Sequence, residues 1–119
     1  ESVDLGIAED VMPFAKRLLN TTYDNLTQID LMLSELAKGW TVDRMSPIDR
    51  NIMRIAVCEM LFFQEEVPIA TAINEAVEIA KDYGDYESPK FINGILGKLA
   101  TSLQRKESAP GKDGAQETS

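Results

Sequence analysis

The sequence predicts an all-α protein, with one long helix followed by a compact bundle of three helices. Apolar residues recur at steps of three and four along most of the chain, which is the period of one helix face. No segment shows the alternating pattern bounded by turn residues that is typical of β-hairpins. With 119 residues, the chain is long enough to bury a single hydrophobic core.

The long helix is expected to begin near Val11, after a loose lead-in over residues 1–9. Asp10 is the expected N-cap, because its carboxylate can accept a hydrogen bond from the free N–H groups of a first turn. Pro13 then falls in that turn, where its missing N–H breaks no intrahelical bond. The apolar period continues to about Ala37, which gives roughly 25 residues or about 38 Å of helix.

Two features are expected to shape the second half of this helix. Asn20, Thr21 and Thr22 are weak helix formers in the middle of the apolar pattern, so a bend is predicted there. Gly39 is the expected C-cap, since glycine readily adopts the backbone conformation that ends many helices. Trp40 is expected to fill the core at the junction between the long helix and the bundle.

The next two helices have clear start and stop signals. Ser46 before Pro47 is an N-cap with proline in the first helical position. Apolar residues cover most of the circumference of the helix that follows, so it is expected to be central. Another helix is predicted from Ile69 to Tyr83, ended by Gly84.

The last helix is expected to start at Ser88-Pro89, which repeats the serine-proline entry, and to run to about Leu103. The helical domain then covers residues 10–104. Residues 105–119 contain nothing that could be buried, so they are predicted to form a disordered tail.

Composition excludes several classes of function. The formal net charge is −8, from 12 basic and 20 acidic residues, which argues against nucleic-acid binding by the whole body of the chain. The chain has no His, no glycine-rich phosphate loop and no nucleophile motif, so we expect no catalytic residue, metal site or cofactor. The single Cys58 is expected in the core of a cytoplasmic protein. No apolar run approaches the roughly 20 residues that span a membrane.

Amide side chains lie in or beside two of the apolar helix stripes. Asn74 follows the core position Ile73, and Asn93 precedes Gly94. Buried amides need hydrogen-bond partners, so Asn74, Glu75 and Asn93 are interpreted as structural, with ligand contact as the alternative. Gly94 is expected to mark a close contact between helices, because a mid-helix glycine costs about 1 kcal/mol relative to alanine.

A small cluster of mixed charge begins the central helix. Arg50 and Arg54 are four residues apart and therefore lie on one helix face. One interpretation is a solvated face on which they pair with Asp49 or Glu78. The alternative is a surface for a protein partner, because arginine is enriched at interfaces.

The start of the last helix is the only segment that looks suited to RNA. Tyr86, Lys90 and Phe91 lie close to a helix N-terminus, together with Tyr83. Helix N-terminal amides attract phosphate, and aromatic side chains stack on unpaired bases. The alternative places Phe91 in the core and the tyrosines over a turn.

The motifs together resemble the bacterial NusB family of transcription antitermination factors. The resemblance covers roughly residues 11–103. It rests on short sequence motifs that occur in the family's order: Trp40, Arg44–Arg50, Ile52–Ala56, Glu59, Val67-Pro68, Ala72–Lys81, Tyr83-Gly84, Ser88 and Lys90–Leu96. It implies an all-helical fold of two small subdomains and no catalysis.

The resemblance also implies partners. Family members pair with NusE, a small-subunit ribosomal protein, bind the boxA element of nascent ribosomal RNA transcripts, and load an antitermination complex on RNA polymerase. Carried over by position, Asp49, Arg50 and Met53 resemble the surface that faces NusE. Tyr86, Glu87, Ser88, Lys90 and Phe91 resemble the region near the RNA.

One departure from the family pattern is large. Family members begin with an Arg-rich segment and two further helices, and nothing here matches them. Because residue 1 is Glu and not Met, we expect a fragment of a longer protein, with a natural short form as the alternative. Two other functions stay open: the NusB-like RNA-binding domain of a ribosomal RNA cytosine methyltransferase, and a helical homodimer without an RNA role.

Overall fold

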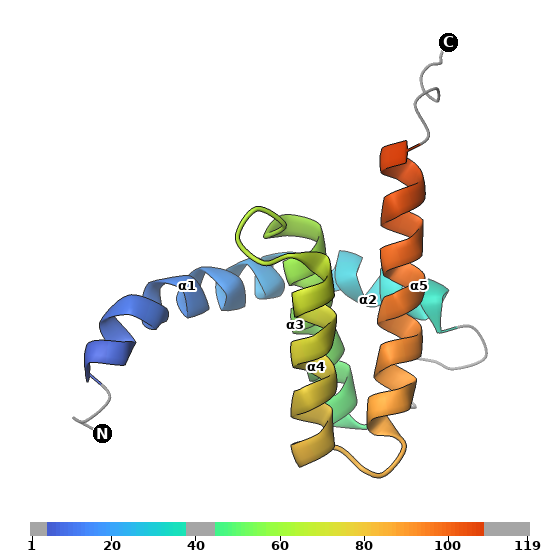
Figure 1. Ribbon diagram of the computed structural model, residues 1–119, viewed down its shortest axis with the longest axis horizontal. Coiled ribbons are helices and arrows are strands. Elements are labelled where there is room, and N and C mark those ends of the chain that lie inside the picture. The colour runs from blue at the N-terminus through green and yellow to red at the C-terminus, as the bar shows by residue number, and fades with distance from the viewer. Residues whose placement is uncertain (1–4, 38–44, 109–119) are drawn as a thin grey trace.

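The computed structural model of the chain describes residues 5–37 and 45–108, and within them the side chains of residues 13–37 and 45–105. The elements in these ranges are α-helices: α1 (Leu5–Asp24), α2 (Leu26–Leu36), α3 (Pro47–Phe62), α4 (Ile69–Tyr83) and α5 (Ser88–Ser108). Helices α3, α4 and α5 pack side by side, α2 crosses α3 and α5, and α1 reaches away (Figure 1). The predicted all-α bundle is confirmed for the described residues.

The start of the long helix was predicted wrongly. α1 begins at Leu5, so residues 5–9 are helical instead of a loose lead-in. Asp10 therefore cannot cap it, and Pro13 lies inside the helix and not in its first turn. A proline in this place removes one intrahelical hydrogen bond, and the helix continues on both sides of it.

The long helix breaks later than expected, at Asn25 and not at residues 20–22. Asn25 has a φ of −114° and a ψ of 20°, outside the helical region, and α2 begins at the next residue. The Asn25 side-chain amide donates to the carbonyl oxygen of Thr21 over 2.8 Å. Asparagine ends a helix readily because its side chain competes for such backbone groups. Gly39 and Trp40 lie outside the described residues.

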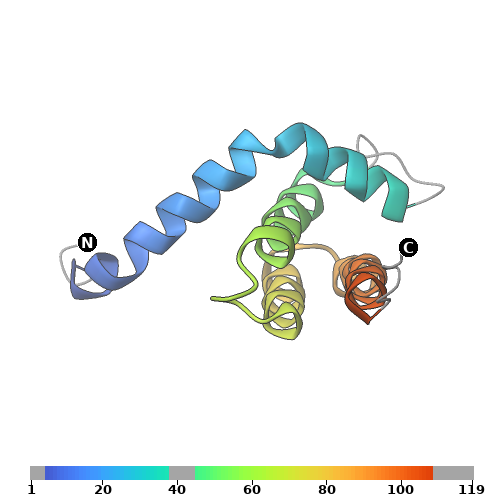
Figure 2. The same ribbon diagram turned by 90° about the horizontal axis from the view of Figure 1, so that it is seen from above.

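α3 occupies the centre of the fold, as predicted. The hydroxyl oxygen of Ser46 accepts a hydrogen bond from the backbone N–H of Asp49 over 3.1 Å, and Pro47 takes the first helical position. α3 packs against α1, α2, α4 and α5, and the view from above shows α1 and α2 along one side of it with α4 on the other (Figure 2). Its helical start and its central place therefore follow from the two signals read in the sequence.

α4 has the predicted bounds, with Gly84 as its C-cap. α5 was predicted to end near Leu103 but continues to Ser108, so residues 105–108 of the expected tail are helical. Residues 109–119 lie outside the described part of the chain. No helix among the described residues is long and apolar enough to cross a membrane.

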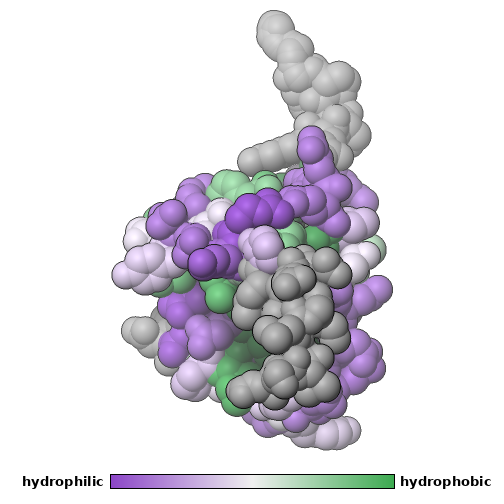
Figure 3. All heavy atoms as spheres, turned by 90° about the vertical axis from the view of Figure 1, so that its left-hand side faces the viewer, coloured by the Kyte–Doolittle hydropathy of each residue, from purple (hydrophilic) through white to green (hydrophobic). Residues whose placement is uncertain are grey.

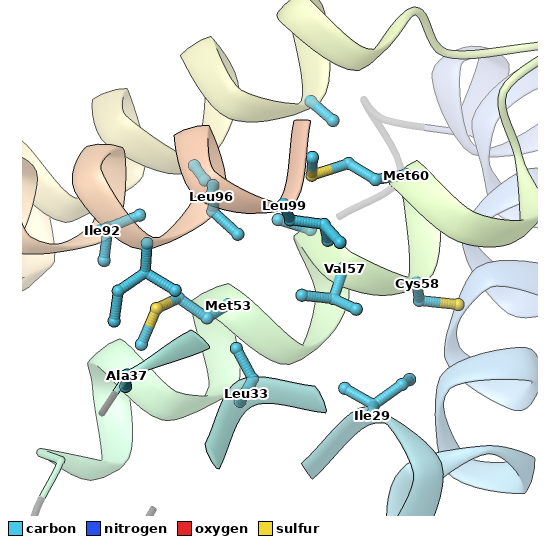
Figure 4. Close-up of a cluster of buried hydrophobic side chains, with 14 of the residues drawn as sticks. Ile29, Leu33, Ala37, Met53, Val57, Cys58, Met60, Ile92, Leu96 and Leu99 are labelled. Carbon is cyan, nitrogen blue, oxygen red and sulfur yellow. The ribbon is translucent and has the colours of Figure 1, made fainter. Parts of the chain in front are cut away.

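The core lies where α2, α3 and α5 meet (Figure 4). Its fully buried members include Ile29 and Leu33 from α2, Met53 and Val57 from α3, and Leu96 from α5. Small side chains line the inner face of α4, where Ala72, Ala76 and Ala80 are buried. These alanines let α4 approach its neighbours closely. The surface seen from the α1 side is mostly hydrophilic, with a few hydrophobic patches (Figure 3).

Candidate nucleic-acid and protein interface

The first turns of α3 and α5 are joined by a buried hydrogen bond. The hydroxyl of Ser88, which is 1% exposed, donates to Oδ2 of Asp49 over 3.0 Å. The same hydroxyl oxygen accepts from the backbone N–H of Asp85 over 2.9 Å. The carboxylate of Asp85 in turn accepts from the N–H groups of Glu87 and Ser88. Asp85 therefore does the capping that was predicted for Ser88.

Gly84 allows the end of α4 and the start of α5 to approach each other closely at this junction. A Cβ atom at this position would lie 2.5 Å from the Ser88 hydroxyl oxygen and 2.9 Å from the carbonyl oxygen of Ala80. The second contact is with backbone, which cannot move aside easily. Glycine is therefore required here by close approach, while its role in ending α4 was already evident from the sequence.

The structure corrects the predicted partner-facing surface of α3. Asp49 is only 7% exposed and Met53 is fully buried, so neither side chain is available for direct contact. Arg50 is half-buried. The exposed side chains near this end of α3 are Ile48, at 46%, and Asn51. Ile48 was not among the residues predicted to face the partner, because apolar residues were expected to cover most of this helix's circumference.

Arg54 has a partner that neither interpretation anticipated. Its guanidinium donates to both carboxylate oxygens of Asp30, over 2.8 Å from Nε and 2.7 Å from Nη2. This bidentate pair links α3 to α2, and it raises the pKa of Arg54 through the hydrogen bond to Asp30. Both side chains are partly buried, so the pair is better placed to stabilise the fold than an exposed pair.

The residues predicted to face RNA divide into two groups. Tyr86 is 97% exposed, Glu87 and Lys90 are exposed, and Phe91 is half-buried. Ser88 points inward to Asp49 and is not on the surface. The exposed group borders a hollow between the end of α2 and the start of α5, lined by Leu36, Ala37, Tyr86, Glu87, Pro89, Lys90, Phe91, Gly94, Ile95 and Lys98. Lys98, which the sequence reading missed, lies one helical turn beyond Gly94.

The amide side chains were misplaced by the sequence reading. Asn74 and Asn93 are both exposed, so the expectation that their amides are buried structural groups is wrong. Glu75 is also exposed. Gly94 is exposed too, and no atom lies within 4 Å of a Cβ built on it, so its predicted role in helix packing is wrong. Each of these residues lies at the flank of an apolar stripe, where periodicity alone does not decide burial.

Glu59 is an ionisable group in the interior, which the sequence analysis named only as part of the family resemblance. It is 7% exposed on α3. Burial, with a smaller effect of the nearby Glu75 carboxylate, raises the pKa of Glu59 from 4.5 to about 7. Its carboxyl group therefore holds a proton more readily than an exposed glutamate and responds to pH near neutrality.

Cys58 lies in the core as predicted, fully buried on α3. Burial raises the pKa of its thiol, which keeps the sulfur protonated and unreactive. Among the described residues, no group of three or more His, Cys, Asp or Glu side chains could hold a metal ion.

The sequence is similar to known proteins over most of its length. It matches the family model described as the NusB family over residues 3–101. The transcription antitermination protein NusB of Heliobacterium modesticaldum is 46% identical over 116 residues, covering 96% of this chain and 56% of that protein. The corresponding protein of Desulfitobacterium hafniense is 43% identical over 104 residues, covering 87% and 70%. The chain thus spans little more than half of the Heliobacterium protein.

Two solved structures have a similar fold. T. maritima NusB is 41% identical, with a TM-score of 0.71, covering 84% of this chain and 66% of that one. A chain in the crystal structure of a plectonemic RNA supercoil is 28% identical, with a TM-score of 0.74, covering 80% and 68%. The helical arrangement described above is therefore shared with solved proteins in both cases.

Proposed function

The chain belongs to the NusB family, and from that premise we propose that it acts as a non-catalytic transcription antitermination factor that pairs with the ribosomal protein NusE and binds boxA RNA. The family match over residues 3–101 carries this proposal. The relatives described above are named transcription antitermination proteins, which favours this function over that of a methyltransferase domain. Their partners in the RNA polymerase antitermination complex are proposed for this chain by the same argument.

The surface proposed for NusE is the outer side of the first turns of α3. Asp49 and Met53 contribute from beneath it: Asp49 fixes the start of α5 through Ser88, and Met53 fills the core. Arg50, Ile48 and Asn51 are the side chains that reach the surface. An exposed apolar residue beside an arginine is typical of protein interfaces.

The surface proposed for RNA is the hollow at the start of α5. Lys90 and Lys98 place positive charge on it, Phe91 forms an apolar part of its lining, and Tyr86 stands fully exposed at its edge. Such a combination of cations and aromatic rings suits unpaired bases. The solved chain from the structure of an RNA supercoil supports an RNA-binding role for this fold.

Isothermal titration calorimetry with purified NusE tests the protein half of this proposal. We expect saturable binding, which Ile48→Asp weakens by at least tenfold, since a charge would then be buried against the partner. Glu65→Lys, at an exposed site on the loop after α3, is the matched control and should leave the affinity unchanged. Equal affinity for Ile48→Asp and wild type would remove this surface from the interface.

A further inference from the structure

Positive charge is concentrated on one helix of this acidic chain. The chain has 20 acidic and 12 basic residues, yet α5 contains no acidic residue between Ser88 and Arg105. The same stretch contains Lys90, Lys98 and Arg105. The other four helices contain at least as many acidic as basic residues. An anionic partner would therefore find its favourable surface on α5.

The three basic side chains lie on one face of α5. Their spacings of eight and seven residues correspond to about two helical turns each, so they follow one line for about 22 Å. All three are exposed, while Ile92, Leu96 and Leu99 occupy the opposite, buried face. Lys98 donates to the carbonyl oxygen of Leu36 over 3.3 Å, which leaves further ammonium protons for a ligand.

Small residues lie between these cations on the same face. Gly94 and Gly97 are in the middle of α5, and no atom lies within 4 Å of a Cβ built on either of them. Thr101 continues this line and is exposed. A mid-helix glycine lowers helix stability relative to alanine. Nothing within the described residues requires these two glycines, and the open space above them leaves the backbone of α5 accessible to a ligand.

Aromatic rings stand at one end of the basic face. Tyr86 is 97% exposed, and Phe91 lines the hollow between α2 and the start of α5. Proteins that bind single-stranded nucleic acid combine a positive track for the phosphates with aromatic side chains on which bases stack. An acidic protein segment would be attracted by the cations but would have no comparable use for both rings.

We propose that the outer face of α5, from Lys90 to Arg105, is a track along which single-stranded RNA extends beyond the hollow at the start of the helix. The bases stack at Tyr86 and Phe91, and the phosphates follow Lys98 and Arg105 with the backbone close to Gly94 and Gly97. This inference rests on the proposed function, and it extends the RNA surface by about four helical turns beyond the residues that the family resemblance supplied.

Fluorescence anisotropy with a labelled single-stranded boxA RNA at several salt concentrations tests the track. Lys98→Gln and Arg105→Gln each remove one charge, and each should weaken binding several-fold. Each should also reduce the slope of log K against log salt by about 0.7, the value for one phosphate contact on a single strand. Lys16→Gln and Lys81→Gln remove the same charge from exposed sites on α1 and α4, and they should leave the slope unchanged.

Gly97→Leu provides a second variant, because the space around this position is open. It should keep the melting temperature at or above that of wild type and weaken RNA binding at least fivefold. Wild-type affinity and salt slope in Lys98→Gln, Arg105→Gln and Gly97→Leu would overturn the track and remove Lys98 from the RNA surface, while RNA binding at Tyr86, Lys90 and Phe91 would remain as proposed. If these variants lose NusE binding while their RNA binding is unchanged, the outer face of α5 binds protein, and the RNA track is also overturned. Absence of RNA binding by the wild-type chain at low salt would overturn both.

Discussion

Ser88 donates a hydrogen bond to Asp49 over 3.0 Å and so joins the first turns of α5 and α3, which lie 39 positions apart in the sequence. Both residues are buried. Asp49 lies beneath the surface proposed for NusE, and Ser88 lies beneath the surface proposed for RNA. The bond therefore fixes the position of one surface relative to the other.

Ser88→Ala should destabilise the protein by about 1–3 kcal/mol, because it leaves the buried Asp49 carboxylate without its donor. Oδ1 of Asp49 already has no hydrogen-bond partner among the described residues, so the loss concerns the other oxygen. Urea denaturation followed by circular dichroism measures the change. Ser34→Ala, on the exposed face of α2, is the matched control and should change stability by less than about 0.5 kcal/mol. Equal stability of the two variants would show that the bond contributes little.

Gly84→Ala and Gly94→Ala should change stability in opposite directions. At Gly84 the added methyl group would overlap Ser88 and the Ala80 carbonyl, so the melting temperature should fall by several degrees. At Gly94 the methyl group meets nothing, so the variant should gain about 0.5–1 kcal/mol from better helix propensity. Differential scanning calorimetry of both variants tests the pair. A loss of stability in Gly94→Ala would mean that its surroundings are more crowded than described.

Glu59 should make stability depend on pH. Its folded pKa of about 7 lies above its ordinary value of 4.5, so between these values the folded state binds more protons than the unfolded state. The free energy of unfolding should therefore fall as pH rises from about 5 to 8, by at most about 3 kcal/mol. Glu59→Gln removes this decrease, and Glu75→Gln should reduce it. If the free energy of unfolding has the same pH dependence in wild type and in Glu59→Gln, the raised pKa of Glu59 is contradicted.

The pair of Arg54 and Asp30 should contribute measurable coupling between α3 and α2. A double-mutant cycle with Arg54→Ala and Asp30→Ala is expected to give about 1 kcal/mol, because the pair is bidentate and partly shielded from water. The exposed pair of Lys81 and Glu78 offers a comparison and should give at most about 0.5 kcal/mol. Equal coupling in both cycles would show that the geometry at Arg54 adds nothing.

Local signals predicted much of the fold. The start of α3 followed from Ser46-Pro47, and the end of α4 followed from Gly84, because caps act through hydrogen bonds within a few residues. The break at Asn25 was missed by a few residues, since three weak helix formers precede it and only the actual side-chain bond to Thr21 decides between them.

The site was less predictable because burial depends on distant segments. Asp49 looked exposed from its own helix, but the start of α5 covers it. Asn93 and Gly94 looked internal from the apolar residues around them, but they lie on the outer face of α5. The family resemblance pointed to the first turns of α3 and α5, and the structure was needed to separate the side chains there that reach the surface from those that support it.

The central claim is that this chain is an RNA-binding partner of NusE, and the affinity for boxA RNA with and without NusE tests it most directly. Fluorescence anisotropy should show that saturating NusE increases the affinity of the chain for boxA RNA by at least tenfold. A scrambled RNA of equal length should gain less. The same affinity for both RNAs, unchanged by NusE, would contradict the proposed function.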